Sequence, residues 1–292
     1  MHDVQKQYKA LTNLTKTTDL GSQAIAEKLE RLCSEAAKFA AEELTIEEVN
    51  SKVPGKRYGV LRRPSDGKRS RPINLDRYNA LLAEDFLKSK GLADIEDLEA
   101  NERSCLLYSM VMSFCAANDI LKSGDKKSPG TFFEIFVGHL FSAKYDLNPM
   151  KHIQVLNLDA DSKLPTDFIF DLGPEKSKIH LPIKLSTRER VVQVWAHQRV
   201  LDGVFGTERF KGVLVILAET NYQGKDNSVV EVCLPQQWAV YQMFIARMFR
   251  VYYLDVPEKY RSLSKQYPFI QVRDFADFFD EADKIVGPPE AP

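Results

Sequence analysis

A carboxylate and a lysine stand on two short strand-like runs in the middle of the chain. Asp167–Asp171 and Ile179–Leu185 are rich in aromatic and β-branched residues, and a turn-like GPEKS segment separates them, which is typical of two neighbouring strands. Asp167 could hold Mg²⁺, which polarises a phosphoryl oxygen and lowers the pKa of a bound water. Lys184 could orient that water and stabilise developing negative charge. The pair suits phosphodiester hydrolysis, although most Asp–Lys pairs on adjacent strands are simply solvated.

Three charged residues, Arg188, Glu189 and Arg190, follow at the start of a predicted helix. A helix N-terminus in the DNA major groove can place two arginines on guanine O6 and N7, while a glutamate accepts from cytosine N4. The cluster therefore suits two adjacent C·G pairs. The alternative is that Glu189 bridges the two arginines on the surface.

Composition limits the class of protein. The 292 residues can bury one large core or two modest ones, and a net charge of −1 excludes a global basic field, so any charge that attracts DNA must be local. The four cysteines form no CxxC pair, which favours free thiols in a reducing compartment over a disulfide or zinc framework. No signal peptide or membrane-spanning apolar run is expected. These features predict a soluble, cytoplasmic protein with no membrane partner.

Positive charge gathers locally between residues 52 and 71, where glycines and prolines argue against a long helix. The segment is either a solvated basic loop or an arm that contacts DNA phosphates and could carry Tyr58 toward a groove or a base. The candidate phosphate contacts are Lys56, Arg57, Arg62, Arg63, Lys68, Arg69 and Arg71.

The periodicity of apolar residues changes along the chain. The first third is mostly helical, and a capping-box pattern at Thr45–Glu48 predicts a short helix there. The second half alternates strands with helices, including a helix over 236–251, and this indicates an α/β core with a central mixed sheet flanked by helices. A polar break over 124–130 places the domain boundary between a helical region, 1–127, and a core, 128–292.

Glu134 lies in a predicted helix over 131–145 that is otherwise apolar. One interpretation is a carboxylate favoured by the positive end of the helix dipole. The other is a carboxylate that points into the metal site.

These features resemble the PD-(D/E)XK nuclease fold in their order: a helix with a glutamate, a strand with Pro-Thr-Asp, a strand that ends in lysine, and Ser-Thr-Arg-Glu-Arg opening a helix. More narrowly, residues 128–202 are similar to type II restriction endonucleases of the CCGG-recognising group, with CCGG or CCNGG-type targets. The resemblance implies that Asp167 binds metal, Lys184 is the catalytic lysine, and Glu134 is the helix glutamate. It also implies that residues 188–190, four to six positions after the lysine, read bases.

Two positions depart from that pattern. The acid expected two residues before Lys184 is Pro182, and the position thirteen residues after it is His197. Histidine is a poor ligand for a hard cation, which prefers oxygen. We therefore expect Glu134 to be the second metal ligand, with Asp171, Glu189 and His197 as alternatives.

The sequence thus predicts a type II restriction endonuclease that cuts double-stranded DNA with Mg²⁺ at a palindromic site containing CC/GG. A palindromic target predicts a two-fold homodimer, and the resemblance implies pairing with a cognate DNA methyltransferase. The alternatives are a repair or structure-specific nuclease of the same fold, and a non-cleaving DNA-binding module, which Pro182 keeps open.

Overall fold

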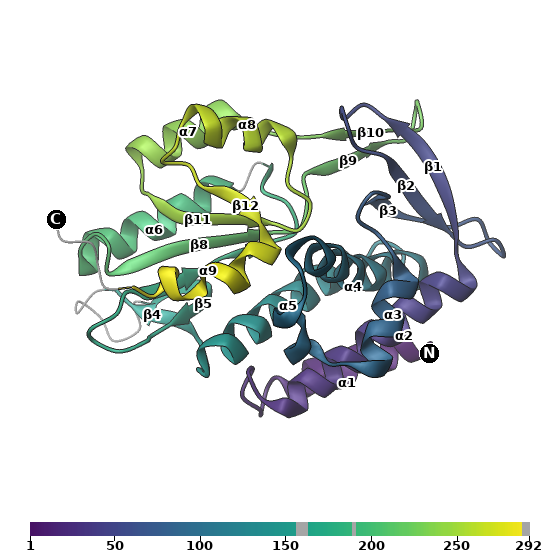
Figure 1. Cartoon of the computed structure of the whole chain (residues 1–292), viewed down its shortest axis with the longest axis horizontal. Helices are drawn as coiled ribbons and strands as arrows, with labels where there is room; N and C mark the ends of the chain where they lie inside the picture. Colours follow the sequence, from purple (N-terminus) through teal and green to yellow (C-terminus); the bar gives the residue numbers. More distant parts are fainter. Residues whose placement is uncertain (156–162, 189–190, 288–292) are drawn as a thin grey trace. The chain divides into compact units, whose positions relative to one another are not determined.

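The computed structural model describes residues 1–155, 163–188 and 191–287, which form two compact units (Figure 1). Unit 1 contains Met1–Ala143 and the segment Thr220–Val232, whereas unit 2 contains Lys144–Glu219 and the chain from Cys233 onward. The predicted boundary after residue 127 falls in the first turn of α5, within unit 1.

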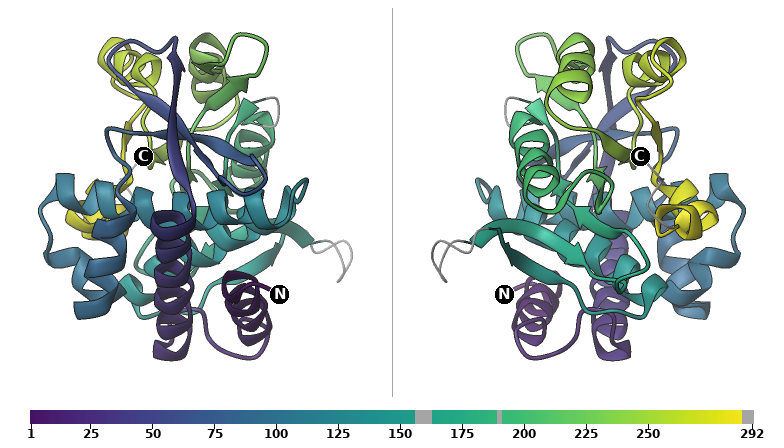
Figure 2. Two further views of the ribbon diagram at one scale, coloured as in Figure 1. Left: turned by 90° about the vertical axis from the view of Figure 1, so that its right-hand side faces the viewer. Right: turned by 90° about the vertical axis from the view of Figure 1, so that its left-hand side faces the viewer.

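Unit 1 combines helices with a five-stranded sheet. Its sheet has the order β3-β2-β1-β10-β9, in which β1 and β10 are parallel and the other neighbours antiparallel. Helices α1 and α2 run side by side in Figure 2. The elements are α1 (Asp3–Leu14), α2 (Gln23–Glu43), β1 (Thr45–Ser51), β2 (Tyr58–Arg62), β3 (Arg69–Asn74), α3 (Ala80–Ser89), η1 (Leu92–Asp97), α4 (Ala100–Leu121), α5 (Lys127–Tyr145), β9 (Thr220–Gln223) and β10 (Ser228–Glu231).

Helix α4 is long and apolar enough by composition to cross a membrane, contrary to the expectation that no such run is present. However, 83% of its apolar window is buried inside the protein. The core helix of a soluble protein passes the same test, so α4 is weak evidence for a membrane, and most of its residues are buried in unit 1.

The helix predicted from Thr45 is wrong, because these residues form strand β1. Helix α2 ends at Glu43, and Pro54 and Gly55, the latter with a φ of 74°, follow too soon for a second stable helix. Pairing with β2, from Thr45 opposite Arg62 onward, supplies the backbone hydrogen bonds instead.

Unit 2 contains a seven-stranded mixed sheet, as predicted. The strand order is β12-β11-β8-β6-β5-β4, with β7 beside β8; β4, β5 and β6 are antiparallel, while β6, β8, β11 and β12 are parallel. The elements are β4 (Met150–Gln154), β5 (Lys163–Phe170), β6 (Lys178–Leu181), β7 (Ile183–Lys184), α6 (Val191–Phe205), β8 (Phe210–Ile216), α7 (Pro235–Phe244), β11 (Met248–Tyr253), α8 (Glu258–Gln266), β12 (Val272–Asp274), η3 (Phe275–Asp277) and α9 (Phe278–Ile285).

The helix predicted over 236–251 is wrong in its second half. Helix α7 ends at Phe244, and Met248–Tyr253 forms β11 between two parallel neighbours, β8 and β12. A strand covered on both faces is almost continuously apolar, so its sequence lacks the alternation that would distinguish it from a buried helix.

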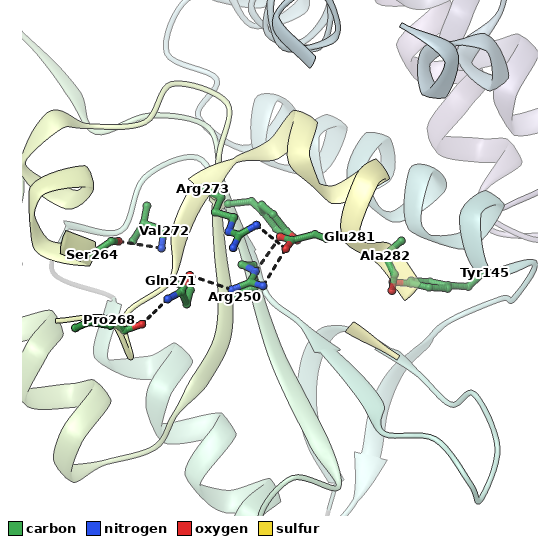
Figure 3. A network of polar contacts seen from close by, with 10 residues as sticks. Tyr145, Arg250, Ser264, Pro268, Gln271, Val272, Arg273, Glu281 and Ala282 are labelled. Carbon is green, nitrogen blue, oxygen red and sulfur yellow. Dashed lines mark hydrogen bonds and ion pairs between the residues drawn. The ribbon is translucent and has the colours of Figure 1, made fainter. Parts of the chain in front are cut away.

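A closed polar network ties α9 to β11 and β12 (Figure 3). The Glu281 carboxylate accepts from Arg250 Nε and Nη2 at 2.8 and 2.9 Å, from Arg273 Nη1 at 2.8 Å and from the Tyr252 hydroxyl at 2.5 Å. Glu281 is only 3% exposed. Four hydrogen bonds therefore compensate its charge, and they offset the cost of burying Arg250 in β11.

Candidate active site

Asp167 and Lys184 meet, as their strands predict. Lys184 Nζ donates to Asp167 Oδ2 at 2.7 Å, and the backbone N–H of Ile183 donates to the same oxygen at 2.7 Å. Antiparallel pairing of Phe168 with Leu181 sets the register that brings the two side chains together. The side chain of Asp167 is 20% exposed and that of Lys184 is 33% exposed, so the ion pair remains open to solvent.

Pro182 has a structural reason to stand where an acid was expected. It continues the register of β6 opposite Asp167, but proline has no N–H to donate to a ladder. Ile183, the next residue, therefore gives its N–H to the Asp167 carboxylate, while the carbonyl of Pro182 still accepts from Val215 of β8 at 3.0 Å. This interruption of the ladder at Pro182 separates β6 from β7. Lys184, two residues later, contacts the carboxylate of Asp167.

A cavity of about 200 Å³ opens beside this ion pair. Asp167 and Lys184 line one part of it, together with Pro182 and His180 from the same sheet face, and α6 contributes Gln193 and His197. The residues at 180, 182 and 184 share a face because side chains alternate along a strand. All of these residues belong to unit 2.

Both histidines at the cavity have lowered pKa values. His197 is partly buried, and burial, aided by the nearby Lys184 charge, lowers its pKa. His180 is fully buried, and this burial lowers its pKa to about 4, although a hydrogen bond to Gln198 opposes the shift. Their rings lie 6.5 Å apart. His180 is therefore neutral at neutral pH.

Gln198 links the cavity to the sheet. Its Nε2 donates to the carbonyl of Phe210 at 2.8 Å and to Asp202 at 2.9 Å, and its Oε1 lies 3.0 Å from His180 Nδ1. Gln198 is thus a hydrogen-bond partner of the sheet backbone. His180 was missed from the sequence, although its position two residues before Pro182 and four before Lys184 on one strand face was a usable signal.

The segment before α6 is held by a buried glutamate, Glu219, which sequence reasoning also missed. Its carboxylate accepts from Thr187 N at 3.0 Å, Thr187 Oγ1 at 2.6 Å and the Tyr253 hydroxyl at 2.8 Å. Arg188 follows, exposed and with a φ of 29°. The other two predicted base-reading residues, Glu189 and Arg190, lie outside the described residues.

Glu134 and Asp171 are the remaining predicted acids. Helix α5 begins at Lys127 rather than near 131, because Asp125 accepts from the N–H groups of Lys127 and Ser128 at 3.0 Å. Glu134 therefore lies about two turns inside the helix, and the explanation by the helix dipole is wrong. It belongs to unit 1, and its metal role stays a prediction. Asp171 pairs instead with Lys178 at 2.5 Å.

The basic segment contains β2 and the start of β3, which pair antiparallel, and its charges are mostly paired within unit 1. Arg71 forms a bidentate pair with Asp119, and Lys56 contacts Glu231 at 2.7 Å. Arg57, Arg63, Lys68 and Arg69 also have acidic partners, whereas Arg62 is exposed and has none within the described ranges. Tyr58 is 1% exposed. The suggestion that it reaches a base is wrong.

The donor set at the cavity fits Mg²⁺ in part. Asp167 supplies a hard carboxylate oxygen, and Mg²⁺ is often bound through one or two carboxylates plus water and substrate phosphate. In the part of the chain that the structure describes, no group of three or more histidine, cysteine, aspartate or glutamate side chains could hold a metal ion. All four cysteines are free thiols, as expected.

Comparison with known proteins supports the architecture. No protein-family model and no curated protein matches the sequence. Among solved structures, the Type IIP restriction endonuclease Kpn2I is 24% identical, with 97% of each chain covered and a TM-score of 0.78. The restriction endonuclease PspGI in complex with substrate DNA is 14% identical over 70% of this chain and 91% of its own, with a TM-score of 0.45. The chain therefore has the α/β fold of Kpn2I.

Proposed function

We propose that this chain is a type II restriction endonuclease, a Mg²⁺-dependent enzyme that cleaves double-stranded DNA at a palindromic site containing CC/GG. The observation that carries the proposal is the contact between Asp167 and Lys184 at the mouth of a cavity of about 200 Å³. The fold shared with Kpn2I supports it.

The roles follow from the chemistry of the two side chains. Asp167 would hold Mg²⁺ through its carboxylate, and the ion would polarise the phosphate and acidify a bound water. Lys184 is held 2.7 Å from that carboxylate, and in the proposed role its ammonium would stabilise the negative charge that develops on the phosphate. Glu134 is the first choice for the second metal ligand, with Asp171, Glu189 and His197 as the alternatives.

Base reading is proposed for residues 188–190, with Arg188 and Arg190 on guanine and Glu189 on cytosine. Arg188 is exposed, which is compatible with that role. One cluster per half-site requires two copies, so the proposal includes a homodimer. A cognate DNA methyltransferase and a cytoplasmic location complete it.

Contacts to the DNA backbone are proposed for the basic segment of unit 1. An arginine already paired with a carboxylate must release or share that partner to bind a phosphate, which reduces its net contribution. Because Arg62 has no acidic partner among the described residues, it is the strongest member of the set. The other candidates remain Lys56, Arg57, Arg63, Lys68, Arg69 and Arg71.

The test is to incubate the purified protein with plasmid DNA and Mg²⁺, or with EDTA in place of the metal, and to sequence the ends. We expect metal-dependent cuts at one palindrome that contains CC/GG. Cuts at junctions or lesions without a common sequence would instead assign a repair nuclease. Cuts at a common site that lacks a CC/GG step would refute the base-reading part alone.

Pro182 favours a second candidate, a DNA-binding module that does not cleave, because it removes a carboxylate from the usual set. Binding and cleavage of one labelled duplex separate the two functions. Sequence-specific binding in Mg²⁺ without any cleavage would support the module.

A further inference from the structure

The hydrogen bonds around Gln198 fix the protonation of His180. Gln198 Nε2 faces the carbonyl of Phe210 at 2.8 Å, and a carbonyl can only accept, so the amide group must point its NH₂ there. Gln198 Oε1 is then the atom that faces His180 Nδ1 at 3.0 Å. An amide oxygen cannot donate, and therefore Nδ1 carries the proton of the neutral ring.

The other ring nitrogen consequently has a lone pair and nothing to accept from. His180 Nε2 is buried and has no hydrogen-bond partner among the described residues. An unpaired buried polar group costs about 1–3 kcal/mol, which is why such groups in native proteins are usually satisfied by a bound water or ion. His180 is one of the residues that line the cavity beside Asp167 and Lys184, and a cavity of about 200 Å³ has room for water.

The surrounding structure is built to hold this arrangement. His180 pairs with Gly212 of β8, and a Cβ at Gly212 would lie 2.7 Å from Gln198 Oε1. A glycine at this position leaves the space that the amide of Gln198 occupies between α6 and the sheet. Gln198 and Gly212 therefore position the ring of His180, and the hydrogen bond to Gln198 determines which ring nitrogen carries the proton.

We propose that His180 Nε2 accepts a hydrogen bond from a water held in the active-site cavity, and so positions that water beside Asp167 and Lys184 for attack on the phosphate. The inference rests on the proposed nuclease function. His180 transfers no proton in this role: it accepts one hydrogen bond, and its Nδ1–H stays on Gln198. It is a positioning residue that acts through the water.

Two substitutions separate this role from a structural one. In His180→Asn the new amide can reach Gln198 but leaves no acceptor at the Nε2 position, whereas in His180→Gln the amide oxygen can lie near the Nε2 position and the bond to Gln198 is lost. We expect His180→Asn to lower kcat on the order of 10²-fold with KM unchanged, because the attacking water would be misplaced, and His180→Gln to retain most of kcat. A purely structural role reverses this order, and that result would overturn the proposal.

His139 provides the matched control. It is 3% exposed in α5 of unit 1, and its Nδ1 donates to the carbonyl of Leu20 at 2.8 Å. Here the Asn variant keeps the structural bond, and the Gln variant loses it. His139→Asn should therefore retain kcat and lower the melting temperature only by the cost of the smaller side chain, whereas His139→Gln should also lose the bond to Leu20. The same kcat loss in both Asn variants would show a general effect of the substitution and would refute the role of His180.

Two measurements do not depend on cleavage, so they distinguish failure of this inference from failure of the proposed function. Proton–nitrogen NMR of the wild-type protein at neutral pH, with His180 assigned by comparison with His180→Asn, should show the Nδ1–H tautomer. A crystal structure should contain a water about 2.7–3.2 Å from His180 Nε2. A protonated Nε2, or a dry one, would overturn the proposal even if the enzyme cleaves DNA.

Discussion

Two carboxylates of unit 2, Glu281 and Asp167, both bind basic side chains, but they differ in how much of their hydrogen-bonding capacity the protein uses. Glu281 is 3% exposed and accepts from Arg250 and Arg273 (Figure 3) and from the hydroxyl of Tyr252, so its hydrogen-bonding capacity is used within the protein. The Asp167 side chain is 20% exposed, pairs with one lysine, and lies beside a cavity. A network whose hydrogen-bonding groups are all satisfied within the protein stabilises the fold. A network with unsatisfied groups can still bind a metal, a water or a phosphate.

The largest expected effect concerns the contact between Asp167 and Lys184, where we expect cleavage to be lost without a loss of stability. Asp167→Asn and Lys184→Met should each lower cleavage on the order of 10³-fold or more, because they remove the metal ligand and the stabilising charge. Their melting temperatures should stay close to that of the wild type. Full cleavage by either variant would contradict the assignment of the active site.

The hydrogen-bond network around Glu281 should show the opposite, a loss of stability when one of its members is removed. Glu281→Ala leaves Arg250 buried without its partner and should lower the free energy of unfolding by about 3–5 kcal/mol in urea titrations. Asp171→Ala, which breaks the more exposed pair with Lys178, is the control and should cost less than about 1 kcal/mol. Equal losses in the two variants would show that burial does not distinguish these pairs.

The protonation of His180 predicts how stability depends on pH. The folded pKa is lowered from 6.5 to about 4, so the unfolded chain binds more protons between these values. The contribution of His180 is therefore fully present above pH 6.5 and is lost as the pH falls toward 4. Urea unfolding of the wild type against His180→Asn should show the difference shrink by up to about 3 kcal/mol across that window. A difference that does not change with pH would contradict the burial of a neutral ring.

The smallest expected effect tests the support behind the cavity. Gly212→Ala places a Cβ 2.7 Å from both Gln198 Oε1 and Met248 Cε, and should cost about 1–3 kcal/mol of stability. It should also lower kcat by displacing Gln198. At Gly203 of α6 a Cβ meets nothing within 4 Å, so Gly203→Ala should instead stabilise by about 0.5–1 kcal/mol. Thermal unfolding and steady-state kinetics of both variants provide the test.

The sequence predicted the contact between Asp167 and Lys184 because its signals are local. Two short strands joined by a turn have few possible registers, and strand alternation decides which side chains share a face. The mixed sheet of unit 2 is also confirmed. It was predictable because an alternation of strands and helices along the sequence leaves few possible topologies.

The errors arose where distant residues decide the structure. Met248–Tyr253 became a strand because β8 and β12 pair with it, and Thr45–Ser51 did so because β2 does. Glu219 contacts Thr187 across 32 positions of sequence, and no local pattern marks such a pair. His180 differs from these, since its place on the strand face with Lys184 was readable.

The segment Thr220–Val232 has a consequence for how the protein is made. It leaves unit 2 after β8, supplies β9 and β10 to the sheet of unit 1, and returns at Cys233. During synthesis on the ribosome, β1 therefore has no parallel partner until β10 is made, when more than half of unit 2 has been translated. The unpaired edge of β1 is exposed over that interval, and chaperone demand should peak there rather than at the end of translation.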